Sequence, residues 1–98
     1  MAWYTTECLY RADIGDGSRE DKPLFEYRYF LLKAENDLSA DQKAHEIAKR
    51  KQHQYSNVEG KRVTWVLERV TGTKEVFAKE LSEETEIYYK YVDQPFPE

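Results

Sequence analysis

Two histidines and an acidic loop come nearest to a metal-binding pattern in this sequence. His45 opens the pentapeptide HEIAK, which departs from the zinc-protease motif H-E-x-x-H because Lys49 stands where a second imidazole would bind the metal. His53 follows His45 by eight positions, about 80° round a helix, so the two imidazoles do not form a natural pair of ligands. The acidic loop lacks the ligand spacing of a calcium-binding EF-hand. Its carboxylates are Asp13, Asp16, Glu20 and Asp21. We therefore predict no metal site.

The candidate nucleophiles are Cys8 and three of the four serines. Nucleophilic catalysis needs a base beside the nucleophile and an acid that orients the base. Cys8 lies in the middle of a predicted strand among apolar neighbours, which indicates an inert core thiol. The serines Ser18, Ser39 and Ser56 fit a loop, a helix cap and a turn. We predict no catalytic residue and no cofactor, and we favour a binding role over an enzymatic one.

Tyrosines concentrate in the predicted strands, where a row of rings could form a binding surface. Tyr27 and Tyr29 share one face of a strand, and Tyr89 and Tyr91 share one face of another. Such rings stack on bases in RNA-binding sheets. The glycine-aromatic signature of those sheets is absent, however, and the net charge is -4. We therefore interpret the tyrosines as core or as a protein interface, and do not favour nucleic-acid binding.

Basic residues cluster near the end of the predicted helix. Residues 43–62 contain six Lys or Arg side chains against two Glu, a net charge of +4. Most of this excess suits the negative end of the helix dipole. The cluster of Lys49, Arg50 and Lys51 could also bind a phosphate or another acidic group, so we keep it as a candidate interaction site.

Hydrophobic patterns place these groups on strands and one helix. Alternation predicts strands at 3–12, 24–34, 62–70 and 85–92. Residues 71–84 suit either a short helix or a strand that continues after a break at Gly72, and we favour a strand at 73–77 followed by a loop. Residues 13–23 contain two glycines and a proline and predict a loop. Residues 39–55 predict the helix, with a capping box of Ser39 and Gln42 and an apolar stripe of Ala40, Ala44, Ile47, Ala48 and Tyr55.

This order of elements predicts an α+β fold. We expect a four- to five-stranded antiparallel sheet with one main helix packed on one face, in the order strand, strand, helix, strand, an optional strand, strand. The strands carry apolar side chains on both faces, whereas one helix covers only one face. The second face therefore needs a cover. The alternatives are self-association, strong curvature of the sheet, the C-terminal tail with Phe96, or a ligand.

Length and composition indicate one small globular domain. The 98 residues are 40% hydrophobic and 35% charged, which supports one core with a polar surface. We predict a single domain, 1–98, with an extended tail over 92–98. Cys8 is the only cysteine, so no internal disulfide can form. Neither a signal peptide nor a membrane-spanning apolar run is evident, so we expect a cytoplasmic protein without a membrane partner.

Five short motifs are spread along the chain: Trp3-Tyr4-Thr5, Lys33-Ala34-Glu35 before an Ala-rich helix, Tyr55-x-Asn57 followed by Gly60, Val63-Thr64-Trp65, and Thr85-Glu86-Ile87-Tyr88. Together they resemble an uncharacterised family of small bacterial proteins, the domain of unknown function 4288. The resemblance covers nearly the whole chain. It implies a stand-alone bacterial cytoplasmic protein and transfers no catalytic residue.

Two functional hypotheses follow from these patterns. The leading one is a protein-interaction module that binds another protein, or itself as a homodimer, through a tyrosine-bearing sheet face or an acidic surface. Its candidate residues are Tyr27, Tyr29, Tyr89 and Tyr91. The alternative is a binder of a small anionic metabolite or nucleotide in a pocket between helix and sheet, with Lys49, Arg50 and Lys51 supplying positive charge.

Overall fold

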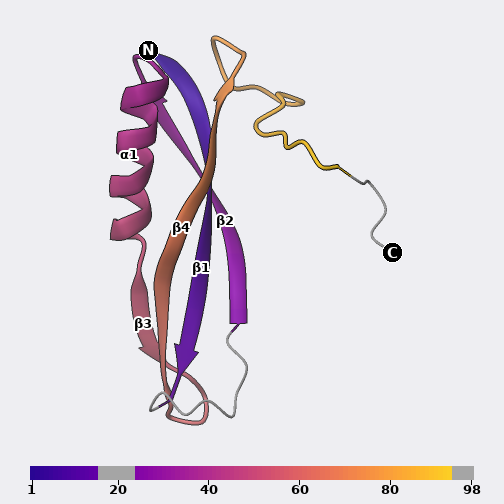
Figure 1. The fold of residues 1–98 in the computed structure, drawn as a ribbon. Helices are drawn as coiled ribbons and strands as arrows, with labels where there is room; N and C mark the ends of the chain where they lie inside the picture. The colour runs from indigo at the N-terminus through magenta and orange to yellow at the C-terminus, as the bar shows by residue number, and fades with distance from the viewer. Residues whose placement is uncertain (16–23, 94–98) are drawn as a thin grey trace.

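The computed structural model describes residues 1–15 and 24–93. Its elements follow one another as β1 (Ala2–Ile14), β2 (Leu24–Ala34), α1 (Asp37–Arg50), β3 (His53–Ser56) and β4 (Arg62–Val76) (Figure 1). The strands form one antiparallel sheet in the order β2-β1-β4-β3. The predicted α+β fold is therefore confirmed. Within the described ranges, no helix has the length and apolar character needed to span a membrane.

The core lies between α1 and the face of the sheet that the helix covers. Tyr10 and Tyr4 of the central strand β1 connect the two layers. The Tyr10 hydroxyl donates to the backbone oxygen of Ala48 at 2.7 Å, and the Tyr4 hydroxyl donates to Asp37 Oδ1 at 3.1 Å. These bonds hold both ends of α1 against β1. The buried residues here include the predicted helix stripe Ala40, Ala44, Ile47 and Ala48, and the β1 residues Tyr4, Cys8, Tyr10 and Ala12.

The helix lies further toward the N-terminus than the sequence predicts. Its N-cap is Asn36, whose side chain accepts from the Ser39 N–H at 2.8 Å, while Ser39 Oγ accepts from the Asn36 N–H at 3.2 Å. The capping box therefore joins Asn36 and Ser39, and not Ser39 and Gln42. The helix ends at Arg50, and Tyr55 lies in β3 opposite Val63. The prediction that it reaches Tyr55 is wrong because pairing with β4 overrides a local helical period.

Strand β4 is longer than predicted, because it continues through Gly72 to Val76 and includes most of the separate strand expected at 73–77. Two β-bulges interrupt its pairing with β1, and the extra residues are Thr71 and Glu68. A bulge shifts the alternation of faces by one residue. Val70 consequently packs against the same core cluster as Leu67, although simple alternation assigns them to opposite faces.

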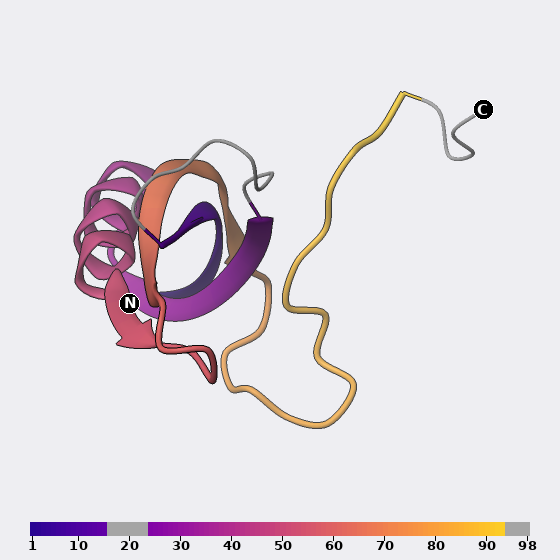
Figure 2. The ribbon, with the colours of Figure 1, turned by 90° about the horizontal axis from the view of Figure 1, so that it is seen from below.

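Residues 77–93 contain no strand, so the predicted strand at 85–92 is wrong. β4 pairs with β1 on one side and, over residues 62–65 only, with β3 on the other; the C-terminal segment, as described over 77–93, pairs with neither side. The C-terminal segment instead lies on the side of the sheet away from α1 (Figures 1 and 2). Its contacts there are made by side chains: the ring centroids of Tyr88 and Tyr29 are 5.2 Å apart, and Lys90 Nζ lies 5.0 Å from the Tyr27 centroid. Residues 16–23 of the predicted loop and 94–98 of the predicted tail, with Phe96, lie outside the described residues.

The sheet curls strongly, as Figure 2 shows. We call the face away from α1 the second face. Curvature and the C-terminal segment together cover its middle, where Thr5 and Glu7 are each 1% exposed. Curvature, one of the predicted covers, is therefore present. Self-association and a ligand stay predictions.

Candidate functional site

The candidate site is the part of the second face formed by β2. Alternate β2 residues point to this face, opposite alternate residues of β1. Their side chains are between 44% and 51% exposed, and β2 is at the edge of the sheet. We call them the aromatic row: Phe25, Tyr27, Tyr29 and Leu31. The period-two pattern of β2 thus places Tyr27 and Tyr29 side by side on one face.

A buried carboxylate lies behind this row. Glu7 of β1 is opposite Tyr29 and only 1% exposed. Its Oε2 accepts a hydrogen bond from the Tyr29 hydroxyl at 2.5 Å, and its Oε1 accepts one from the Thr71 hydroxyl at 2.7 Å. Lys90 Nζ lies 3.3 Å from both oxygens. We call these four residues the Glu7 cluster; it joins β1, β2, β4 and the C-terminal segment.

Hydrogen bonding sets the ionisation of the Glu7 cluster. Burial opposes ionisation of Glu7, but the hydrogen bonds from Tyr29, Thr71 and Lys90 outweigh it and lower the pKa of Glu7 below its usual value. The hydrogen bond to Glu7, followed by burial, raises the pKa of Tyr29 to about 12. A carboxylate that is fully hydrogen-bonded and has a lowered pKa is a weak general base. The cluster therefore serves to anchor the chain rather than to transfer protons.

The β4 bulge and Gly72 shape this cluster. Because Thr71 is the extra residue of a bulge, its hydroxyl reaches Glu7. Gly72 leaves room for the Tyr88 side chain, since a Cβ at Gly72 would lie 2.8 Å from the Tyr88 hydroxyl oxygen. Burial raises the pKa of Tyr88. Sequence reasoning missed Glu7, Thr71, Tyr88 and Lys90. The signal for the bulge was a glycine inside a strand, which often marks a bulge or a close approach.

Residues 3–89 match the family model described as a domain of unknown function, DUF4288. The chain belongs to this family. The matched range includes Glu7, Tyr29 and Thr71, whereas Lys90 lies one residue beyond it. No curated protein and no solved structure matches the chain.

Tyr89 and Tyr91 of the DUF4288 chain do not join the aromatic row. Their rings contact each other edge to face, with centroids 5.7 Å apart, and Lys74 Nζ lies 5.2 Å from the Tyr89 centroid. Tyr91 is 86% exposed. The neighbours that alternate with them, Tyr88 and Lys90, make the contacts with the aromatic row. The structure thus brings Tyr88, and not the predicted Tyr89, next to Tyr29.

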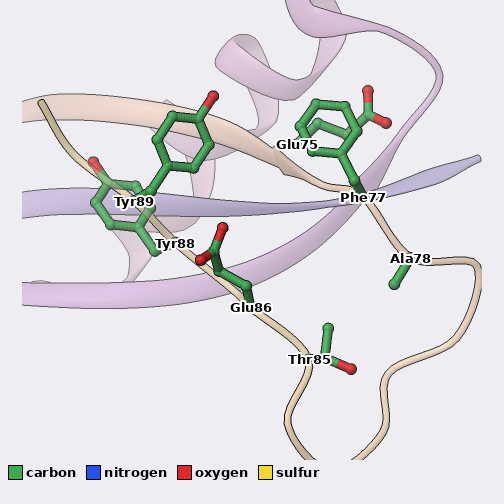
Figure 3. A pocket seen from close by; sticks show the side chains of 7 residues that line it. All are labelled: Glu75, Phe77, Ala78, Thr85, Glu86, Tyr88 and Tyr89. Atoms are coloured by element: carbon green, nitrogen blue, oxygen red, sulfur yellow. The ribbon is translucent and has the colours of Figure 1, made fainter.

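A hollow of about 240 Å³ opens between the end of β4 and the C-terminal segment. Figure 3 shows Glu75 and Phe77 on one side of it, and Thr85, Glu86 and Tyr89 on the chain that faces them. A second hollow of about 450 Å³ includes Glu35 and shares the Glu75 and Phe77 wall. The first hollow thus has two glutamates in its wall, and the second has two glutamates and Lys79.

The predicted basic cluster lies at the C-terminal end of α1. Lys49 and Arg50 occupy the last helical turn and Lys51 follows as the C-cap. All three are exposed, and Lys51 Nζ lies 5.9 Å from the Phe30 ring centroid. Neither of the two hollows is lined by these residues. Their position at the negative end of the helix dipole stabilises α1.

The two histidines and the cysteine are separate from one another. His45 Nδ1 is 2.8 Å from the Asp41 backbone oxygen, and His53 lies in β3. Cys8 is fully buried, and burial raises the pKa of its thiol. Among residues 1–15 and 24–93, no group of three His, Cys, Asp or Glu side chains is arranged to hold a metal ion.

Proposed function

We propose that this DUF4288 protein is a protein-interaction module that binds its partner through the aromatic row of β2. The observation that carries the proposal is the row itself. Four large apolar side chains, each about half exposed, lie together along an edge strand on the face that the helix does not cover. Contiguous apolar surface of this kind marks interaction sites on small proteins.

The rings of the row are held in place before any partner binds. The Glu7 carboxylate fixes the Tyr29 hydroxyl, and the Lys90 ammonium lies over the Tyr27 ring. Fixed aromatic side chains lose little conformational entropy on association, which is why tyrosine is enriched at protein interfaces. The edge of β2 also offers backbone hydrogen-bonding groups to an extended partner segment.

The alternative, a small anionic ligand, receives less support. A ligand of this type needs a pocket with an excess of positive charge. One hollow is lined by Glu75 and Glu86, and the other by Glu35 and Glu75 together with a single lysine, Lys79, so neither has such an excess. The basic side chains Lys49 and Arg50 are on α1 and line neither hollow. We also infer that the interaction takes place in a reducing compartment such as the cytoplasm, because the chain has one cysteine and makes no disulfide of its own.

The experiment compares two surface variants with the wild-type protein. Phe25→Thr combined with Tyr27→Thr removes two rings and keeps residues that favour strands. Tyr55→Thr is the matched control, because Tyr55 is 48% exposed on the other edge strand, β3. Each protein is immobilised and offered an extract of the native organism, and retained proteins are quantified by mass spectrometry.

We expect the wild type and Tyr55→Thr to retain the same partner, and the double variant to lose it about tenfold or more, since buried aromatic residues dominate interface energies. Thermal unfolding of all three proteins checks that they are folded. Equal retention by the double variant and the control would overturn the proposal.

A further inference from the structure

The two edges of the sheet differ in how they are protected. At one edge β3 has 4 residues and covers only residues 62–65 of β4, and beyond them two bulges interrupt β4. Short edge strands and bulges both resist pairing with other chains. At the other edge β2 has 11 residues, contains neither proline nor glycine, and has its one lysine, Lys33, next to its end. Within the described residues, only β1 pairs with β2. The Lys43 side chain covers the Lys33 backbone oxygen at 2.9 Å, so the part of the edge toward Leu24 is the open part.

We propose that this open edge pairs with the same edge of a second copy of the chain. Antiparallel pairing of β2 with β2 about a two-fold axis at Tyr27 would join the two sheets into one. This inference rests on the proposed function and names its partner. An isologous contact of this kind is the commonest arrangement in homodimers.

Symmetry restricts the register of such a pair. A two-fold axis perpendicular to the sheet reverses the strand direction but keeps each face on its own side. Residues that lie directly opposite each other in an antiparallel pair have their side chains on the same face. The two-fold axis must therefore lie midway between one residue and the same residue of the second copy. The aromatic rows of both copies consequently continue along one surface.

Charge selects one of the registers that symmetry allows. Glu26 and Arg28 lie next to each other on the helix side of β2 and form an ion pair at 2.5 Å. Centring the pair on Glu26 or on Arg28 would place like charges opposite each other, which destabilises a sheet. Centring it on Tyr27 places Glu26 of each copy opposite Arg28 of the other. The same register places Phe25 opposite Tyr29, an aromatic pair on the second face.

Cysteine cross-linking tests the register. Opposed Cα atoms in an antiparallel pair are about 4.5–5.5 Å apart, which lies within the range that a disulfide bridges. We expect Tyr27→Cys to form an intermolecular disulfide under mild oxidation. The matched control is Leu31→Cys, on the same face of the same strand and 44% exposed. In the register centred on Tyr27, the cysteine side chains introduced at position 31 of the two copies would be eight residues apart along the strands, about 27 Å at 3.4 Å per residue. They should therefore not cross-link. Native Cys8 is fully buried, so the wild type measures the background.

Sedimentation equilibrium tests the dimer and its charge pairing. We expect the wild type to approach twice the chain mass of 11.7 kDa as its concentration rises, and Glu26→Arg to raise the dissociation constant about tenfold, because two attractive pairs become repulsive. Arg28 also lies over the rings of Tyr10 and Trp65, at 4.7 Å and 5.1 Å from their centroids, so substitution at Arg28 would disturb the core and is avoided.

The outcomes separate the two proposals. A monomeric wild type, or equal cross-linking of the Tyr27→Cys and Leu31→Cys proteins, overturns the homodimer. If a monomeric protein still retains a foreign partner through its aromatic row, the interaction module stands and only the second copy is wrong. If the Phe25→Thr and Tyr27→Thr protein neither loses a partner nor changes its mass, both proposals fail.

Discussion

Replacing Glu7 with glutamine tests whether one buried carboxylate holds the C-terminal segment and the aromatic row on the sheet. Glutamine keeps the size of the side chain but replaces one acceptor oxygen with an NH₂ donor. The carboxylate receives hydrogen bonds from the Tyr29 and Thr71 hydroxyls, one on each oxygen. After the substitution one of these hydroxyls must turn or lose its acceptor, and the Lys90 ammonium loses its counter-charge.

The expected magnitude follows from the burial of each partner. A hydrogen bond to a charged group contributes about 1.5–3 kcal/mol. The Lys90 side chain is 50% exposed, so its ion pair adds at most about 1 kcal/mol. A neutral amide costs less to bury than a carboxylate, which offsets part of the loss. We therefore expect Glu7→Gln to lower the free energy of unfolding by about 2–3 kcal/mol, or the Tm by roughly 10–20 °C for a domain of this size.

Urea unfolding at neutral pH measures this loss, and Thr5→Val is the matched control. Thr5 lies two residues before Glu7 on the same face of β1 and is equally buried. Its hydroxyl has no hydrogen-bond partner within the described part of the chain. Removing an unsatisfied hydroxyl while keeping the side-chain shape should cost little or even stabilise, so we expect Thr5→Val to change the free energy of unfolding by less than about 1 kcal/mol.

The pH dependence of stability supplies the decisive comparison. The folded state lowers the pKa of Glu7, so its contribution is present above the unfolded pKa of about 4.3 and is lost as pH falls through the folded pKa. Glu7→Gln cannot titrate at this position and should lose less stability between neutral and acid pH. If Glu7→Gln unfolds at the wild-type urea midpoint, or if both proteins lose stability in parallel below pH 5, the reasoning about this carboxylate is refuted.

Two further substitutions and one pH range test the packing. Gly72→Ala should lower the free energy of unfolding by about 1 kcal/mol, because its Cβ would lie 2.8 Å from the Tyr88 hydroxyl oxygen. Tyr88→Phe removes that oxygen, so a double-mutant cycle in urea should recover most of the loss; full additivity would contradict the contact. Burial raises the pKa of Tyr10 to about 12. Its share of stability is complete below the unfolded pKa of about 10 and is lost as pH rises through about 12. Circular dichroism between pH 9 and 12 should show a shallower loss for Tyr10→Phe, and parallel curves would contradict this.

Local periodicity was enough to predict the parts of the fold that depend on one-sided burial. Strands predicted at 3–12 and 24–34 lie within β1 and β2, and the alanine stripe of the helix is buried. The same rule explains the error at 85–92. Alternation there reflects the contacts that Tyr88 and Lys90 make with the sheet, and such contacts require no backbone pairing. A pattern of burial does not say whether the backbone is paired.

The site was less predictable than the fold because it depends on irregularities. Tyr27 and Tyr29 follow from the alternation of β2. Glu7 could be seen as a charge within an apolar strand, but its partner Thr71 reaches it only because a bulge in β4 interrupts the alternation. The one local sign of that bulge is Gly72 beside it. A bulge depends on the register of two strands distant in sequence, which no single strand contains.

The geometry divides the second face into a closed centre and an open edge. At the centre Glu7 is buried under Tyr29 and Lys90, so substitution there acts on stability. At the edge Tyr27 is 50% exposed and its hydroxyl is not required to satisfy a buried charge. Replacing Tyr27 should therefore weaken association with little effect on unfolding. Replacing Glu7 should mainly lower the free energy of unfolding and, because it releases the Tyr29 hydroxyl, should weaken association less than replacing Tyr27 does. Because the two effects arise from different free energies, measuring both variants by urea unfolding and by sedimentation shows whether the aromatic row acts in binding or only in packing.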